Sequence, residues 1–158
     1  MNLIRSTALA CFAMIGATLP AKAAFQLVYV VIGVSDNGGT DLDGKATVFH
    51  CTNLFNAPAN ARVQVRREDG TVAGATKTQT IPAFGSAYFY TKNSVYFFNA
   101  PGGDLNTGPV AFGQGRILSE TPNSIVCSAE YVNNVSGDNF SSPRRMIRFP
   151  RGTSGGED

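Results

Sequence analysis

The sequence predicts an all-β fold, a two-layer antiparallel sandwich of seven to nine short strands. In residues 124–133 (SIVCSAEYVN), apolar residues recur at every second position, which is the period of a half-buried strand. Clusters of glycine, proline and asparagine separate several such stretches at short intervals. No stretch has sustained helical periodicity, so the short strands favour a sandwich over an open sheet.

The first predicted strand, residues 25–34 (FQLVYVVIGV), is apolar on both parities, so both of its faces should be covered. Residues 35–45 form a loop by composition. Alternation returns in residues 46–54 (ATVFHCTNL), where Phe49 and Cys51 share the parity expected to face the core.

A tight hairpin is predicted around Asp69-Gly70, which lies between the alternating residues 61–67 and a return strand over residues 71–81. Glycine accepts the positive φ that such a turn needs. An aromatic-rich strand follows at residues 86–91, and residues 95–98 are a short apolar run.

Residues 110–119 form a strand that Gly113 and Gly115 weaken, with a bulge as the expected result. It should form a hairpin with the strand that contains Cys127. Residues 134–143 are polar and read as a loop, and residues 144–149 (RRMIRF) read as the last edge strand.

The N-terminus has the layout of a secretory signal peptide. An apolar run over residues 6–19 is followed by Pro20 and by Ala21-Lys22-Ala23, so cleavage is expected before Ala24. A membrane-anchoring helix is the alternative, but the run is shorter than the roughly 20 residues that span a bilayer. The expected parts are a cleaved leader (1–23), a sandwich domain (24–149) and a disordered tail (150–158).

Removal of the leader changes the charge and the cysteine count. Arg5 and Lys22 leave with it, so 11 of the 13 basic residues remain against 11 acidic residues and the net charge is zero. No overall field then attracts nucleic acid or a membrane surface. Two cysteines remain, Cys51 and Cys127, and an even number in an exported chain favours a disulfide over two separate buried thiols.

One cysteine on an early strand and one on a late strand, both facing inward, resemble the layout of immunoglobulin-like sandwiches. The segments DGTV, IPAFG, GRILS and IVCSA also resemble secreted bacterial β-sandwich proteins that are mostly uncharacterised. The resemblance implies that the bond between Cys51 and Cys127 clamps the two layers of sheet together.

The sequence offers little for a metal site or a nucleophile. His50 is the only histidine, and it should point away from the face that carries Cys51, because adjacent strand residues point to opposite faces. Asp36, Asp41 and Asp43 are weak calcium candidates, but they fit a polar turn better than an EF-hand loop. We therefore expect no metal site and no cofactor.

Two pairs of acids invite comparison with glycosidases, which need two carboxyl groups a few ångströms apart across a cleft. Glu68 and Asp69 lie at a predicted hairpin tip, and Glu120 and Glu130 on neighbouring strands of a predicted hairpin. Neither arrangement predicts a cleft, and no G-x-S-x-G motif is present, so the protein is not expected to be an enzyme.

Basic residues gather at the end of the predicted domain. They alternate with apolar residues and are Arg144, Arg145, Arg148 and Arg151. One interpretation is a patch that binds an anionic ligand such as an acidic polysaccharide. The alternative is that these charges protect an edge strand from aggregation.

These observations favour an exported, non-enzymatic module that binds a protein or glycan partner in the periplasm or at the cell surface. A second hypothesis is a structural subunit in which residues 25–34 add a strand to a neighbour's sheet. A hydrolase comes third, because no site can be assembled for it. We expect an unknown protein or polysaccharide as partner, no nucleic acid, and no membrane span once the leader is removed.

Overall fold

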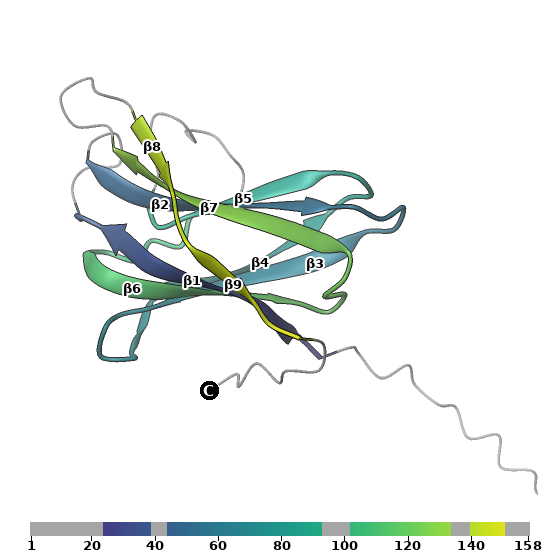
Figure 1. The fold of residues 1–158 in the computed structure, drawn as a ribbon, viewed down its shortest axis with the longest axis horizontal. Helices are drawn as coiled ribbons and strands as arrows, with labels where there is room; N and C mark the ends of the chain where they lie inside the picture. The colour runs from purple at the N-terminus through teal and green to yellow at the C-terminus, as the bar shows by residue number, and fades with distance from the viewer. Residues whose placement is uncertain (1–23, 39–43, 93–101, 134–139, 151–158) are drawn as a thin grey trace, which may run out of the picture.

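The structure is a computed structural model that describes residues 24–38, 44–92, 102–133 and 140–150, and within these ranges it has nine strands and no helix. The strands form two antiparallel sheets packed against each other (Figure 1). Sheet A has the order β4-β3-β6-β1-β9, and sheet B has the order β5-β2-β7-β8. The predicted immunoglobulin-like two-layer sandwich is confirmed.

The bounds are β1 (Gln26–Asp36), β2 (Lys45–Asn53), β3 (Ala59–Arg66), β4 (Val72–Ile81), β5 (Ser86–Tyr90), β6 (Val110–Ser119), β7 (Ile125–Asn133), β8 (Phe140–Pro143) and β9 (Met146–Arg148). Over the described ranges, no helix is long and apolar enough to cross a membrane. The predicted leader and most of the predicted tail lie outside these ranges, as does the apolar run at residues 95–98.

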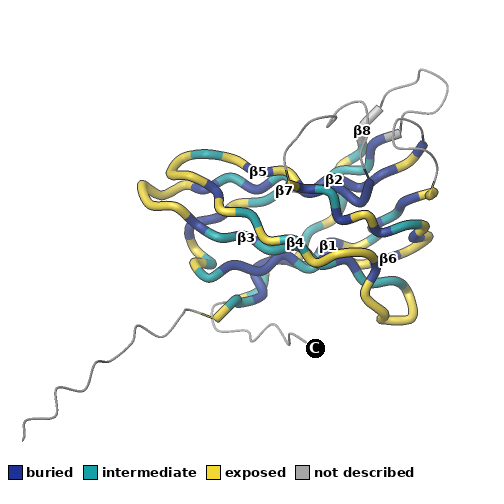
Figure 2. Tube along the Cα trace, turned by 180° about the vertical axis from the view of Figure 1, so that it is seen from behind, coloured by how far each residue is buried: buried dark blue, intermediate teal, exposed yellow. Residues whose placement is uncertain are grey.

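The core lies between the two sheets and is built from the inward-facing residues of both. Buried and half-buried positions alternate without a break along β3 (Figure 2). Gly115, expected from the sequence to weaken β6, has a packing role, because a Cβ there would collide with the ring of Phe49 from the other sheet. The largest buried core side chains are Val28, Val31, Val34, Phe49, Val63, Val65, Ile81, Phe89, Leu105, Ile117 and Ile125.

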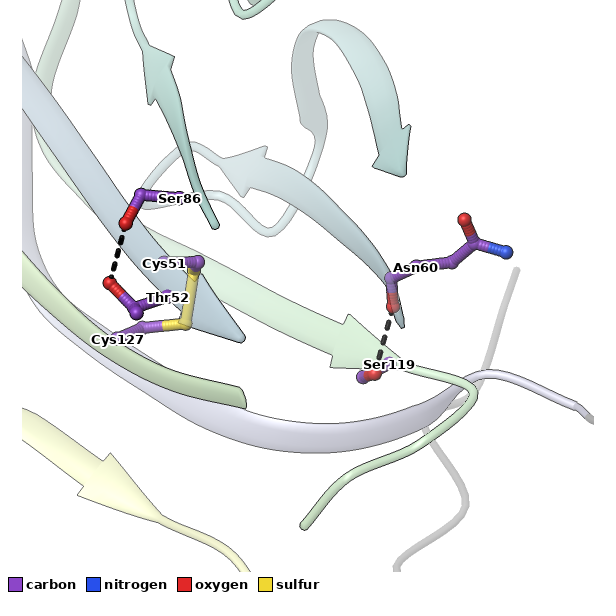
Figure 3. Close-up of a disulfide and its surroundings, with 6 residues drawn as sticks. All are labelled: Cys51, Thr52, Asn60, Ser86, Ser119 and Cys127. Carbon is purple, nitrogen blue, oxygen red and sulfur yellow. Dashed lines mark hydrogen bonds between the residues drawn. A yellow bond between two sulfur atoms is a disulfide. The ribbon is translucent and has the colours of Figure 1, made fainter. Parts of the chain in front are cut away.

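The predicted disulfide is confirmed, since the sulfur atoms of Cys51 and Cys127 are bonded. Cys51 is buried in the core, and Cys127 is half-buried and packs against the same cluster. Figure 3 shows the bond beside the hydrogen bond of 2.9 Å between the hydroxyls of Thr52 and Ser86, which joins β2 to its other neighbour, β5.

The expectation that this bond clamps the two sheets together is wrong. Cys51 and Cys127 lie directly opposite each other on β2 and β7, which are neighbours in sheet B, with their Cα atoms 4.1 Å apart. The alternation of apolar residues shows that both side chains face inward, but it carries no information on which sheet each strand joins. The bond therefore fixes the register of two paired strands within sheet B and does not cross between the layers.

One further expectation about strand pairing is confirmed and two are corrected. The predicted hairpin at Asp69-Gly70 forms between β3 and β4, and Gly70 has the expected positive φ of 84°. However, β6 and β7 do not pair: β6 lies in sheet A and β7 in sheet B. The polar residues 140–143, expected to be a loop, form β8 at the edge of sheet B.

The last described segment passes from one sheet to the other. The N–H of Arg144 donates to the carbonyl of Ala129 in sheet B at 2.8 Å, and the next residue, Arg145, accepts from the N–H of Ile32 in sheet A at 3.1 Å. The segment thus supplies β8 to one sheet and β9 to the other, and it crosses the open side of the sandwich (Figure 1). Pro143 fits at this edge because it has no N–H to donate to a ladder.

We expect the Cys51→Ala/Cys127→Ala double variant to lower the free energy of unfolding by about 4 kcal/mol, because the bond closes a separation of 76 residues and restricts the unfolded chain. Urea denaturation of the variant and of the oxidised wild-type protein measures the difference. Wild-type protein reduced with dithiothreitol is the control and should lose a similar amount. Equal stability of the oxidised and reduced forms would contradict the expectation.

Candidate functional site

The predicted basic patch does not gather at one point. The guanidinium of Arg144 lies over the ring of Tyr131 in sheet B, 4.6 Å from its centroid. The guanidinium of Arg148 lies 5.8 Å from the ring of Tyr29 in sheet A. Arg145, between them in the chain, is exposed. Arg151 lies outside the described residues. The arginines are thus spread along the crossing segment.

Of the calcium candidates, the structure describes only Asp36. Its carboxylate is 3 % exposed and accepts from the N–H of Gly38 at 2.7 Å and from the hydroxyl of Thr107 at 3.4 Å. The Nζ of Lys92 lies 4.0 Å away. Asp41 and Asp43 fall outside the described residues, and within those described no three His, Cys, Asp or Glu side chains gather as a metal site would require.

His50 and Cys51 point to opposite faces of β2, as their parity predicts. Cys51 faces the core, whereas the His50 ring stacks on Tyr88 of β5 with centroids 4.5 Å apart and an interplanar angle of 8°. The Nε2 atom of His50 is buried and has no hydrogen-bond partner among the described residues. The disulfide and this geometry leave no Cys–His pair for nucleophilic catalysis.

Of the two predicted acid pairs, Glu120 and Glu130 are placed in different sheets, and Glu68 and Asp69 lie side by side in the β3–β4 turn. Glu120 follows β6 and accepts from the side-chain amide of Asn60 at 2.8 Å, whereas Glu130 lies on β7 in the other sheet. Their expected hairpin does not exist. At the β3–β4 turn, the Asp69 carboxylate accepts from the hydroxyl of Thr71 at 2.7 Å and from its N–H at 2.9 Å. The hydrogen bond from the Thr71 hydroxyl is the larger cause and that from the Thr71 N–H the second, and together they hold the pKa of Asp69 below its ordinary value.

We expect a chemical-shift titration to place the midpoint of Asp69 below the ordinary value for an aspartate. Because the folded-state pKa is depressed, any stabilisation from these bonds is present at neutral pH and is lost as the pH falls through that midpoint. Thr71→Val removes the hydroxyl donor and should move the midpoint upward. A wild-type midpoint at or above the ordinary value would contradict the interpretation.

Three loops meet at the end of the sandwich where β2 stops, and buried Asn53 joins them. Its amide nitrogen donates to the carbonyls of Ala57 at 2.7 Å, Pro82 at 3.1 Å and Ile81 at 3.3 Å, and its Oδ1 accepts from the N–H of Phe55 at 3.1 Å. The backbone N–H of Asn53 donates to the carbonyl of Gly85 at 2.9 Å. One residue thus fixes the β2–β3 and β4–β5 loops relative to each other.

The β6–β7 loop is tied to the same end, because Leu54 N–H donates to the carbonyl of Ser124 at 2.7 Å. The Ser124 hydroxyl in turn donates to the carbonyl of Thr121 at 2.7 Å. At the start of this loop, the Ser119 hydroxyl donates to the carbonyl of Asn60 at 2.8 Å, which ties β6 to β3 (Figure 3). All three loops are therefore held by hydrogen bonds.

These loops expose large apolar side chains. Leu54 is 53 % exposed, Phe55 52 % and Phe84 69 %. Phe84 also has a positive φ of 56°, a conformation that costs of order 1–3 kcal/mol for a bulky residue. Its N–H donates to the carbonyl of Phe55 at 3.2 Å. We call Leu54, Phe55 and Phe84 the loop platform.

A cavity of about 300 Å³ lies beside the loop platform, lined by Phe55, Pro58 and Pro122 among others. The β2–β3 loop (residues 54–58) and the β4–β5 loop (82–85) contain no charged residue, and the β6–β7 loop (120–124) contains one, Glu120, whose carboxylate accepts from Asn60. The platform is therefore apolar and rigid, and no described residue that lines its cavity is charged. In the sequence, the platform is marked only by the aromatic residue in the segment P-A-F-G at residues 82–85. That segment predicts a turn and nothing about binding.

A second hollow lies at the opposite end of β2, between the sheets, where β9 no longer covers β1. This cavity of about 410 Å³ is lined by residues from five parts of the chain. We call it the seam groove; its lining includes Ser35, Asp36, Lys45, Phe112, Tyr131 and Arg144. Of the three arginines of the predicted patch that the structure describes, only Arg144 is in this lining.

Comparison of the chain with protein families, with curated proteins and with solved structures found no match.

Proposed function

We propose that the protein is an exported, non-enzymatic module that uses the loop platform to bind a protein partner in the periplasm or at the cell surface. Export is supported by the leader-like residues 1–23 and by the disulfide, which persists in oxidising compartments. A non-enzymatic role is supported by the placement of Glu120 and Glu130 in different sheets and by the engagement of both core cysteines in the disulfide.

The exposed, strained Phe84 is the observation that carries the proposal. A chain gains no stability by placing a large ring in water on a backbone conformation that glycine adopts more easily. Strain of this kind persists where the surrounding structure imposes it, and it concentrates at ligand-binding sites. Here the hydrogen bonds of Asn53 and of the Phe55 carbonyl impose it.

The platform also has the energetic properties of a protein-binding surface. Its loops are already ordered, so binding loses little conformational entropy. Exposed aromatic side chains beside a cavity are typical anchors of protein interfaces. Because the platform and the described lining of its cavity carry no charge, the partner's surface should be apolar, and salt should affect the interaction little.

The alternative of a structural subunit joined by its N-terminal strand has less support. β1 lies inside sheet A, paired with β6 on one side and with β9 on the other. Donating β1 to a neighbour would break both ladders and remove Val28, Val31 and Val34 from the core.

We expect Phe84→Gly to abolish partner binding while raising the free energy of unfolding by about 0.5–1 kcal/mol, because glycine accepts the positive φ and little buried surface is lost. The exported protein, purified from the periplasm, serves as bait for periplasmic and cell-surface proteins. Denaturation with urea measures stability.

Phe112→Ala is the matched control, because Phe112 is even more exposed but lies in the seam groove. A partner should be captured equally by the wild type and Phe112→Ala, and its capture should persist when NaCl is raised from about 0.1 M to about 1 M. Capture that survives Phe84→Gly, or that salt removes, would show that the platform is not the binding surface.

A further inference from the structure

We propose that the seam groove is a separate binding site for the carboxylate groups of an acidic polysaccharide. The groove lies at the Lys45 end of β2, and the loop platform lies at the Asn53 end. The two sites share no lining residue, so this inference does not depend on the function proposed for the platform.

The described lining of the groove favours an anion. Lys45 and Arg144 are its cationic side chains, and Asp36 is its one carboxylate. The Asp36 carboxylate is already satisfied inside the protein, by Gly38, Thr107 and nearby Lys92, whose side chain is 8 % exposed. The charges left to face a ligand are therefore positive.

Arg144 has the orientation of a carboxylate receptor. The face of its guanidinium rests on the Tyr131 ring, which holds the side chain in place. The N–H groups of a guanidinium lie in its plane, where they can form paired hydrogen bonds with a carboxylate. The Nε atom of Arg144 is buried and has no hydrogen-bond partner among the described residues, so a donor in that plane is unused.

Phe112 supplies a surface for a sugar ring. Its side chain is 79 % exposed, the largest exposure among the exposed large apolar side chains of the described residues. A pyranose has an apolar C–H face and a polar rim, so it can stack on an aromatic ring while its carboxylate contacts a cation. A groove that combines an exposed ring with a lysine and an arginine matches this pattern.

A glycan fits the groove better than an acidic peptide does. A bound peptide strand would need free backbone groups on β1, but Ser35 N–H donates to the Thr47 hydroxyl at 2.9 Å, and that hydroxyl donates to the Ser35 carbonyl at 3.0 Å. Asn37 N–H likewise donates to the carbonyl of Lys45 at 3.3 Å. Recognition must then come from side chains.

The floor of the groove is preorganised by a partly buried polar network. The Nζ of Lys92 donates to the Oδ1 of Asn37 at 2.7 Å, and the same oxygen accepts from the N–H of Lys45 at 3.0 Å. Asp36 joins this network through Lys92 and Thr107. The end of β1, the start of β2 and the chain after β5 are thereby held together, which fixes the backbone of Lys45 at the groove.

Isothermal titration of the exported protein with polygalacturonate tests the proposal. We expect binding that weakens as salt is raised, and none to fully methyl-esterified polygalacturonate, which has the same sugar rings without the charge. Arg144→Ala should weaken binding roughly 10- to 100-fold through the lost charged hydrogen bonds, and Arg144→Lys should recover only part of it. Phe112→Ala should also weaken binding.

Arg145→Ala is the matched control, since it removes the same charge from the next, exposed residue, which does not line the groove. It should leave the affinity within about twofold of the wild type. Circular dichroism and the intact mass of the oxidised protein verify that each variant is folded. Phe84→Gly should bind polygalacturonate normally, which separates this site from the platform.

Four outcomes would overturn the proposal. They are no binding of polygalacturonate, an equal loss in Arg144→Ala and Arg145→Ala, equally tight binding of dextran sulfate, and equally tight binding of polyglutamate that Phe112→Ala does not change. The last would assign the groove to an acidic peptide, and dextran sulfate binding would show that carboxylates are not selected.

Discussion

The uninterrupted pairing of β2 with β7 is the constraint on which the rest of the structure depends. The register runs from Lys45 opposite Asn133 to Asn53 opposite Ile125 without a shift, and the bond between Cys51 and Cys127 fixes it. A slip of one residue would turn Phe49 and Asn53 to the outer face of the sheet. The core would lose its central ring, and the β2–β3 and β4–β5 loops would lose their common hydrogen-bonding partner.

Much of the fold could be predicted because it depends on local patterns. The alternation along β3 and the Asp-Gly turn predict a hairpin, and an exported chain with two core-facing cysteines predicts the bond between them. The assignment of strands to sheets could not be predicted, because it depends on contacts between distant segments. β6 and β7 follow each other in the chain and yet belong to different sheets. β8 has no apolar alternation that would reveal it, since a short edge strand needs none.

The candidate sites were less accessible to sequence reasoning for the same physical reason. Arg144 belongs to the predicted basic patch, but its place on Tyr131 follows from the crossing of the last segment between the sheets. The strain at Phe84 follows from hydrogen bonds to Asn53 and Phe55, far away in the sequence. Asp36 reads as a loop aspartate, yet it is buried because Lys92 and Thr107 come to it from distant parts of the chain.

The crossing of residues 140–150 has a consequence for how the chain matures. β1 and β7 each receive one of their two neighbours from this segment, which follows all other described strands. Until it docks, both sheets present unpaired backbone groups, and such edges recruit strands from other molecules. A polypeptide shortened before residue 140 would keep every large buried core side chain, and it would expose β1 and β7 as two unpaired edge strands. Solubility in this protein therefore depends on residues 140–150 more than on the composition of its interior.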